Sequence, residues 1–203
     1  MRRVTLAQLD QVAAAFAGII DANSPYTFRH STRVAHIARE LGTRMGVSEE
    51  DERLLYQGGL LHDVGKLGIS NRILDKPGAL TAEEFQQVTL HPLYSWEILS
   101  HVRAFSHLAA PASRHHERLD RKGYPWGLGR SDLDLSTRII TVTDVFEAIT
   151  ANRPYREPMS SEQVLRLLER EAGPSLDPDV VTTMIQLLGE RGNEPAFGLA
   201  FEN

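Results

Sequence analysis

The residues that could carry chemistry in this 203-residue sequence are histidines and carboxylates in unusual settings. His62 and Asp63 directly follow the apolar run 58–61, and Asp144 stands inside the apolar stretch 139–146, where burying a carboxylate is costly unless a cation pairs with it. Four further histidines have distinctive contexts: His30, His91, and the adjacent pair His115 and His116. Imidazole and carboxylate groups without thiolate suit Fe, Mn, Zn, Ni or Co. The set as a whole predicts a centre for two metal ions.

Each of these residues taken alone has an ordinary explanation. A histidine such as His91, just before Pro92, is usually a hydrogen-bonding residue at a helix end or in the core. Asp144 could cap a turn or pair with Arg138. We expect surface or packing roles for the remaining histidines, His36, His101 and His107. The prediction of a metal centre therefore depends on the ensemble and on no single member.

The elements that must position these residues are helices, because apolar residues recur at a spacing of three to four almost throughout. Helix-start signals stand at Thr5, Ser48 and Thr81. The expected helices span residues 5–20, 27–46, 48–61, 81–91, 93–99, 105–112, 135–149, 161–171 and 178–188. Residues 117–134 are charged and rich in glycine and proline, which predicts a long loop, and such loops are often functional. We predict an all-α helical bundle with one long loop.

Composition limits the classes of function. The formal net charge is −5, which disfavours a broad electrostatic contact with DNA. The absence of cysteine excludes disulfides, thiolate metal sites and a cysteine nucleophile. No apolar run approaches the roughly 18 residues of a membrane span, so we expect a cytoplasmic protein. We divide the chain into an N-terminal helix that is a cap or connector (1–24), a catalytic domain (25–190) and a C-terminal tail (191–203).

Two motifs make the sequence resemble a known family. Residues 62–66, HDVGK, resemble the HDxGK signature of the HD phosphohydrolase superfamily. Residues 115–125, HHERLDRKGYP, resemble the HHExxDGxGYP signature of the HD-GYP family. The resemblance extends from residue 25 to about residue 190, and the ordered set of motifs with GYP is highly specific.

The resemblance implies a helical HD domain that hydrolyses cyclic di-GMP to pGpG by attack of a hydroxide that bridges the metal ions, and it leaves open whether hydrolysis continues to GMP. One ion is expected among His30, His62, Asp63 and Asp144. Asp63 is expected to bridge to a second ion, which His91, His115 and His116 complete. Catalytic roles are implied for Asp63 and Lys66, the latter at a phosphate oxygen. Substrate binding is implied for Lys66, Tyr124, Arg153 and Arg156, although the two arginines also fit an ordinary polar surface turn.

The sequence departs from the family pattern at three positions, and each departure leads to a prediction. Tyr26 stands where members with a third metal carry glutamate, and a phenol is a poor ligand at neutral pH. We therefore expect two divalent ions, Fe or Mn in the first place, with Zn, Ni or Co as further candidates. Arg121 replaces a glycine of the signature and is expected to alter the loop. Glu147 replaces an aspartate and is long enough to orient Lys66.

Other functions remain open from the sequence. The substrate could be 3′3′-cyclic GMP-AMP, while the GYP match disfavours a simple nucleotide or (p)ppGpp. The chain could also be a non-catalytic module that senses a nucleotide or docks a cyclase. The family uses the GYP loop to bind diguanylate cyclase domains, and an N-terminal sensor or receiver domain is a further expected partner.

Overall fold

The computed structural model describes residues 4–22, 29–151 and 159–191. Within these ranges the chain forms helices and loops, with one isolated bridge between Ala172 and Leu176. The α-helices are α1 (Leu6–Ala22), α2 (His30–Arg44), α3 (Glu49–Leu61), α4 (Asn71–Leu74), α5 (Ala82–Val88), α6 (His91–His101), α7 (Ala109–Ser113), α8 (Leu135–Thr150), α9 (Ser161–Glu171) and α10 (Pro178–Arg191). The short 3₁₀ helices are η1 (Val64–Gly68), η2 (Ser106–Leu108) and η3 (Arg130–Asp132). The predicted all-α class is confirmed.

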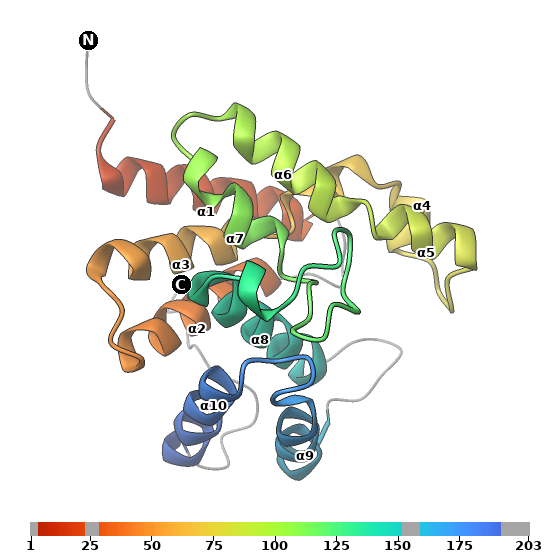
Figure 1. Cartoon of the computed structure of the whole chain (residues 1–203). Coiled ribbons are helices and arrows are strands. Elements are labelled where there is room, and N and C mark those ends of the chain that lie inside the picture. The colour runs from red at the N-terminus through yellow and green to blue at the C-terminus, as the bar shows by residue number, and fades with distance from the viewer. Residues whose placement is uncertain (1–3, 23–28, 152–158, 192–203) are drawn as a thin grey trace.

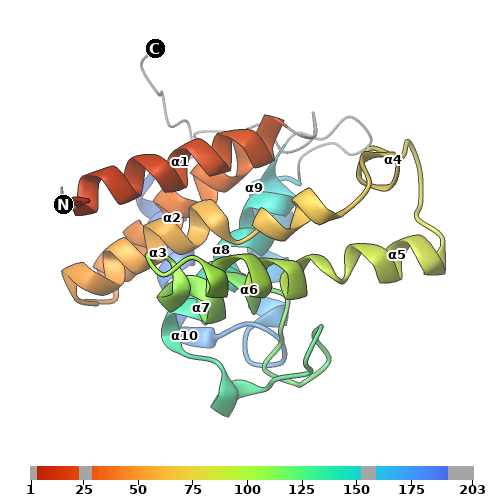
Figure 2. The ribbon, with the colours of Figure 1, turned by 90° about the horizontal axis from the view of Figure 1, so that it is seen from above.

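Helix α8 lies in the middle of the molecule, and α2 and α3 pack against it (Figure 1). Helix α1 lies across α2 and α3 on one side, and α9 and α10 lie together at the opposite end of the bundle. The short helices α4 and α5 lie at the same edge of the molecule in both views (Figures 1 and 2). Among the described residues, no helix has the length and apolar character needed to cross a membrane.

Two clusters of buried apolar side chains hold the helices together. One surrounds α8 and joins it to α2, α3, α9 and α10, with Ile37, Leu55 and Ile140 at most 1% exposed. The other joins α1, α2, α3, η1, η2, α6 and α7 through residues such as Ala35, Leu61 and Leu108. Because α2 and α3 contribute to both clusters, the ends of these helices have little freedom to move.

The N-terminal helix is tied to the helix that follows it. Thr5 and Gln8 form the expected capping pair at the start of α1. Near its end, Asp21 accepts hydrogen bonds from the backbone N–H and the hydroxyl of Ser31 at 3.2 and 2.7 Å. This contact joins α1 to the first turn of α2, where His30 lies. The division of the chain at residues 24 and 190 stays a prediction.

The helix boundaries differ from the predicted ones around residues 91–93. Helix α6 begins at His91, two residues earlier than the pattern predicts, with Pro92 in its first turn. Proline is tolerated there because the first backbone N–H groups of a helix have no partner within it. The sequence pattern predicts a break in the helix at His91 and Pro92, and the structure has the start of α6 there. The first turn of α6 fixes the backbone of His91.

Candidate metal centre

Three helices bring the first group of predicted ligands together. His30 is the first residue of α2, His62 follows the last residue of α3, and Asp144 lies in α8. All three residues are buried, and their ligand atoms lie within 4.8 Å of one another. The two Nε2 atoms of His30 and His62 are 3.2 Å apart, and Oδ1 of Asp144 lies 3.3 Å from Nε2 of His30. We call this set the carboxylate group.

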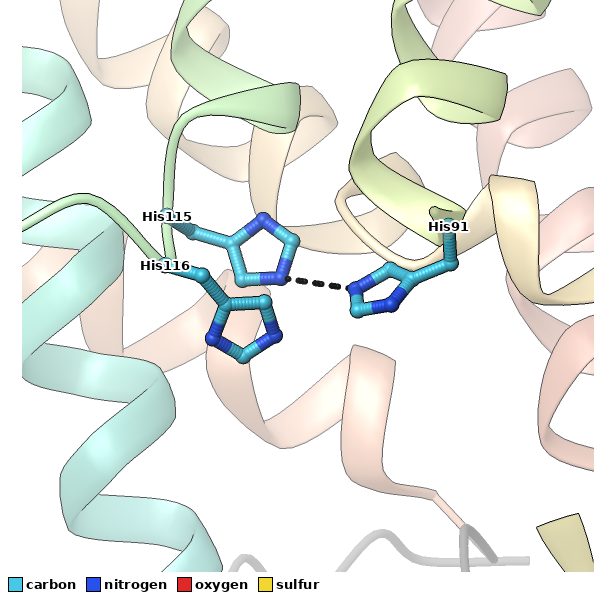
Figure 3. A group of neighbouring side chains, drawn as sticks. All are labelled: His91, His115 and His116. Atoms are coloured by element: carbon cyan, nitrogen blue, oxygen red, sulfur yellow. Dashed lines mark hydrogen bonds between the residues drawn. The ribbon is translucent and has the colours of Figure 1, made fainter. Parts of the chain in front are cut away.

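A second group consists of three histidines from two other places in the chain. His91 starts α6, and His115 and His116 follow α7, so the three rings converge from opposite sides (Figure 3). Their ligand atoms also lie within 4.8 Å of one another, and the Nε2 atoms of His91 and His115 are 3.4 Å apart. We call this set the histidine group.

Asp63 lies between the two groups and presents one carboxylate oxygen to each. Its Oδ2 is 3.6 Å from Nε2 of His30 and 3.3 Å from Nε2 of His62. Its Oδ1 is 3.3 Å from Nε2 of His91 and 3.8 Å from Nε2 of His115. The residue is 1% exposed, and Oδ1 has no hydrogen-bond partner. A buried, unpartnered carboxylate oxygen facing two imidazole nitrogens is the arrangement expected of a bridging metal ligand.

Backbone carbonyl groups fix the orientation of three of the rings. In each case Nδ1 donates to the carbonyl three residues earlier: His62 to Gly59 at 2.8 Å, His91 to Val88 at 2.7 Å and His115 to Ala112 at 2.7 Å. A carbonyl can only accept, so Nδ1 carries the proton and Nε2 is left with its lone pair. This is the usual support of a histidine that binds a metal through Nε2.

His30 has a carboxylate in place of a carbonyl. Its Nδ1 hydrogen-bonds to Oε2 of Glu147, and Oε1 of the same carboxylate accepts from Nε of Arg33 at 2.7 Å. The expectation that Glu147 orients Lys66 is therefore wrong. Glu147 reaches across to α2, and the Lys66 ammonium pairs with Oδ2 of Asp63. Sequence reasoning gave Arg33 no role.

The pKa values of the histidines shift in opposite directions in the two groups: that of His30 is raised, and those of the histidine group are lowered. Burial alone would lower the pKa of His30, but the hydrogen bonds that its ring donates to the carboxylates of Asp144 and Glu147 outweigh burial and raise the pKa to about 10. Burial likewise opposes ionisation of Asp63 and Asp144. Lys66 and the neighbouring histidines nevertheless hold the pKa of Asp63 well below its usual range, and the histidines do the same for Asp144. The carboxylate group therefore favours a bound cation.

In the histidine group, burial keeps the imidazoles neutral. It lowers the pKa of His91 to about 3, and it also lowers the pKa values of His115 and His116. Neutral imidazole is the form that binds a metal. Together with the unpartnered oxygen of Asp63, this donor set of nitrogen and oxygen atoms fits two divalent ions.

The glycine of HDVGK allows this meeting of elements. A Cβ atom on Gly65 would lie 1.9 Å from the carbonyl oxygen of His91 and 2.5 Å from the backbone nitrogen of Ser95. The Gly65 N–H donates to the Ser95 hydroxyl, which in turn donates to the carbonyl of His62, each at 2.9 Å. Any larger residue would push η1 away from α6 and separate Asp63 from His91.

The GYP loop closes over the histidine group. The buried carboxylate of Glu117 accepts from the backbone N–H groups of Trp126 and Leu128 at 2.7 and 2.8 Å. A Cβ atom on Gly123 would lie 2.5 Å from Cα of Glu117. Tyr124 thereby stacks on His116, with ring centroids 4.7 Å apart and an interplanar angle of 24°. Sequence reasoning missed the anchoring role of Glu117, although its place in the signature was a usable signal.

Arg121, which replaces a glycine of the signature, retains the backbone conformation that glycine favours. Its φ is 63°, in the left-handed region, and its guanidinium pairs with Asp132 at 3.0 Å. The side chain lies over Gly129, where a Cβ atom would be 2.8 Å from Cγ of Arg121. The change therefore adds an ion pair across the base of the loop.

Four other residues named from the sequence are not part of the two ligand groups as the structure describes them. Arg138 pairs with Asp177 at 3.0 Å, so the alternative of an Asp144–Arg138 pair is wrong. Tyr26, Arg153 and Arg156 lie outside the described residues, and the expectations for them stay predictions.

Comparisons with known proteins agree with these features. The HD domain model matches residues 14–180. A 3′3′-cGAMP-specific phosphodiesterase 3 from Vibrio cholerae is 41% identical over 182 residues, covering 90% of this chain and 40% of the relative. A cyclic di-GMP phosphodiesterase from Thermotoga maritima is 38% identical over 163 residues, covering 79% of this chain and 44% of the relative. The chain belongs to the HD domain family, and its expected place among the HD-GYP proteins is confirmed. It spans about two fifths of the length of these relatives.

Solved structures support the fold. The crystal structure of a cyclic GMP-AMP specific phosphodiesterase from Vibrio cholerae is 34% identical and has a TM-score of 0.57, with 93% of this chain and 43% of that chain covered. The HDG"Y"P protein Bd1817 from Bdellovibrio bacteriovorus has a TM-score of 0.69 at 14% identity, with 91% and 65% covered. The second likeness concerns the fold alone.

Proposed function

We propose that this chain is a metal-dependent phosphodiesterase that hydrolyses cyclic di-GMP to linear pGpG, either stopping there or continuing to GMP. The observation that carries the proposal is Asp63, whose two oxygens face two separate groups of ligands while one of them has no hydrogen-bond partner. The names of the relatives, which are cyclic di-GMP and cGAMP phosphodiesterases, support the same class of substrate.

The carboxylate group of His30, His62 and Asp144 would hold one ion, the histidine group would hold the other, and Asp63 would bind both. Two divalent ions supply Lewis-acid stabilisation of a phosphodiester and a water of lowered pKa as nucleophile. Fe and Mn are our first candidates, and the nitrogen and oxygen donors also suit Zn, Ni and Co.

Lys66 is the cation placed to act on the substrate. Its side chain is 23% exposed, whereas the Asp63 carboxylate with which it pairs is 2% exposed. The ammonium therefore lies at the solvent side of the bridging residue, where a phosphate approaching the centre can replace Asp63 as its partner. Three mobile donors on a positive charge stabilise the negative charge that develops on the phosphate oxygens.

Tyr124 and the two arginines would bind the rest of the substrate. Tyr124 forms a wall beside His116 and is the part of the GYP loop that touches the centre. A cyclic dinucleotide has a second phosphate that the ions do not hold, and Arg153 and Arg156 are our candidates for it. Replacing either arginine with alanine is expected to weaken cyclic di-GMP binding roughly tenfold to hundredfold without loss of metal. Bis-p-nitrophenyl phosphate, with a single phosphate, should be affected less.

A second candidate substrate is 3′3′-cyclic GMP-AMP. It is favoured by the 41% identity with a Vibrio cholerae phosphodiesterase named for that substrate and by the 34% identity with a solved structure of the same name. The reaction and the metal centre are the same for both substrates. A non-catalytic sensing or docking module is disfavoured, because every described residue of the predicted ligand set takes part in one of the two groups or in the bridge between them.

The deciding experiment incubates metal-loaded protein with cyclic di-GMP and, separately, with 3′3′-cyclic GMP-AMP, and resolves the products by chromatography. Linear dinucleotide from cyclic di-GMP supports the proposal, and a preference for the mixed cycle replaces the first candidate by the second. Tight binding of either nucleotide without turnover would support the sensing module and contradict the proposed enzyme.

The docking of diguanylate cyclase domains on the GYP loop, an N-terminal sensor or receiver domain and a cytoplasmic location stay predictions. The loop does present Trp126, which is 39% exposed and whose ring lies 6.0 Å from that of Trp96.

A further inference from the structure

Two helices hold the His30 ring between them through paired positions. Helix α2 contributes His30 and Arg33, and α8 contributes Asp144 and Glu147, each pair three residues apart and therefore on one face of its helix. Asp144 faces Nε2 of the ring at 3.3 Å, and Glu147 accepts from Nδ1. Arg33 then closes the set, with Nε 2.7 Å from Oε1 of Glu147 and Nη2 bonded to the same oxygen.

This support is unlike that of the other rings in the centre. His62, His91 and His115 each use a neutral backbone carbonyl close by in the chain, whereas His30 uses a charged side chain 117 residues away. His30 is the first residue of α2, and Arg29 before it supplies no side-chain cap. Because Nδ1 of His30 bonds to Glu147, the orientation of the ring is set from α8.

Glu147 itself has little capacity left to bind a metal. It is 2% exposed, one oxygen is bonded to His30, and the other is bonded twice to Arg33. A carboxylate buried to this degree is costly unless it is paired with a cation, and Arg33 provides a two-donor partner that lysine could not reproduce.

We propose that Glu147 and Arg33 are positioning residues for metal binding at the carboxylate group. Arg33 fixes Glu147, and Glu147 fixes the direction and donor strength of His30. The inference depends on the metal centre of the proposed function, and it assigns the charged pair to one of the two ions only.

The test is a titration of metal-free protein with Mn²⁺, which resolves the binding steps without any measurement of activity. Glu147→Gln keeps the size of the side chain and removes its charge. It should weaken one binding step by roughly tenfold to hundredfold, the range typical for the loss of such a support, and leave the other step nearly unchanged. The weakened step should be the one that Asp144→Asn removes. In a protein that already carries Asp144→Asn, adding Glu147→Gln should not change the remaining step.

Two variants of Arg33 should weaken metal binding to intermediate degrees. Arg33→Met should weaken the same step as Glu147→Gln, but less, because Glu147 still reaches His30. Arg33→Lys should fall between Arg33→Met and the wild type. The matched controls lie on the same helix α2: Glu40→Gln removes a carboxylate that pairs with Arg44, and Arg39→Met removes an arginine that stacks on Tyr56. Neither control should change either binding step.

The possible outcomes distinguish the positioning role of Glu147 from the existence of the metal centre. If the wild type binds two ions and Glu147→Gln leaves both steps unchanged, the positioning role is wrong and the metal centre stands. If both steps weaken equally, together with a lower melting temperature of the metal-free protein, Glu147 has a structural role only. If the wild type binds no ion, the proposed centre fails, and the inference fails with it.

Discussion

The two ligand groups on either side of Asp63 are built from different chemistry. The carboxylate group contains two histidines and Asp144, with Glu147 directly behind one ring. The histidine group has three imidazoles and shares only the bridging carboxylate. The surroundings raise the pKa of His30 to about 10 in the first group and lower that of His91 to about 3 in the second.

The difference indicates that the two proposed ions would be held for different reasons. Accumulated negative charge would attract a cation to the carboxylate group, and neutral nitrogen donors would coordinate one in the histidine group. Carboxylate-rich sites suit Mn, whereas imidazole suits Fe, Zn and Ni, so the two positions are expected to differ in metal preference. Asp63 makes them one centre, and the following predictions test how far each group acts alone.

The largest effect is expected from Asp63→Ala, because Asp63 is the residue that faces both groups. It should abolish the binding of both ions and reduce phosphodiesterase turnover by roughly a thousandfold or more. Metal content and activity are measured on the same preparation. Asp63→Asn, which keeps the shape, should behave alike, and two ions retained in either variant would contradict the bridging role.

Single-group variants should each remove one ion. Asp144→Asn is expected to lose the ion of the carboxylate group, and His91→Asn that of the histidine group, while the other ion stays bound. Turnover should fall by about a hundredfold or more in both, because the proposed reaction uses both ions. Elemental analysis gives the count. Loss of both ions in either variant would mean that the groups do not bind independently.

Lys66→Ala should separate binding from turnover. Because its ammonium contacts Asp63 from the solvent side, both ions should stay bound while turnover falls by roughly a hundredfold. Lys76→Ala is the matched control, since Lys76 pairs with Glu84 and should leave activity unchanged. Metal loss in Lys66→Ala would assign the lysine to the structure of the centre.

The smallest effect is expected from Tyr124→Ala, which removes the ring stacked on His116. An aromatic contact of this kind contributes about 0.5–1.5 kcal/mol, so metal affinity of the histidine group should fall roughly twofold to tenfold. Tyr124→Phe keeps the stacking and should retain the affinity. An equal loss in both variants would show that the hydroxyl matters and the ring contact does not.

Much of this centre could be predicted from the sequence, because His62, Asp63, His115 and His116 occur in signatures whose spacing is local. HDVGK places His62 and Asp63 at the end of a buried helix, and the structure adds the reason for the glycine, a close contact with the carbonyl of His91. The fold class followed from helical periodicity. The short elements η1 and α4 did not, because helices of five and four residues show too little of the pattern.

The contacts between distant elements could not be predicted. The sequence shows that Glu147 departs from the family pattern, but whether its extra methylene reaches Lys66 or His30 depends on the crossing of α2 and α8. The same is true of Arg33, which belongs to no sequence motif. Its role depends on its contact with Glu147, a partner 114 residues away. Long-range ion pairs of this kind depend on how the helices pack, so the local spacing of residues does not predict them.

The most direct test of the bridged two-ion centre is the number of divalent ions per chain after anaerobic loading with Fe²⁺ or Mn²⁺, measured by elemental analysis of the full chain. We expect two, one in the carboxylate group and one in the histidine group, with Asp63 between them. A third ion at equal occupancy would contradict the expectation attached to Tyr26, and a single ion or none would contradict the bridged centre itself.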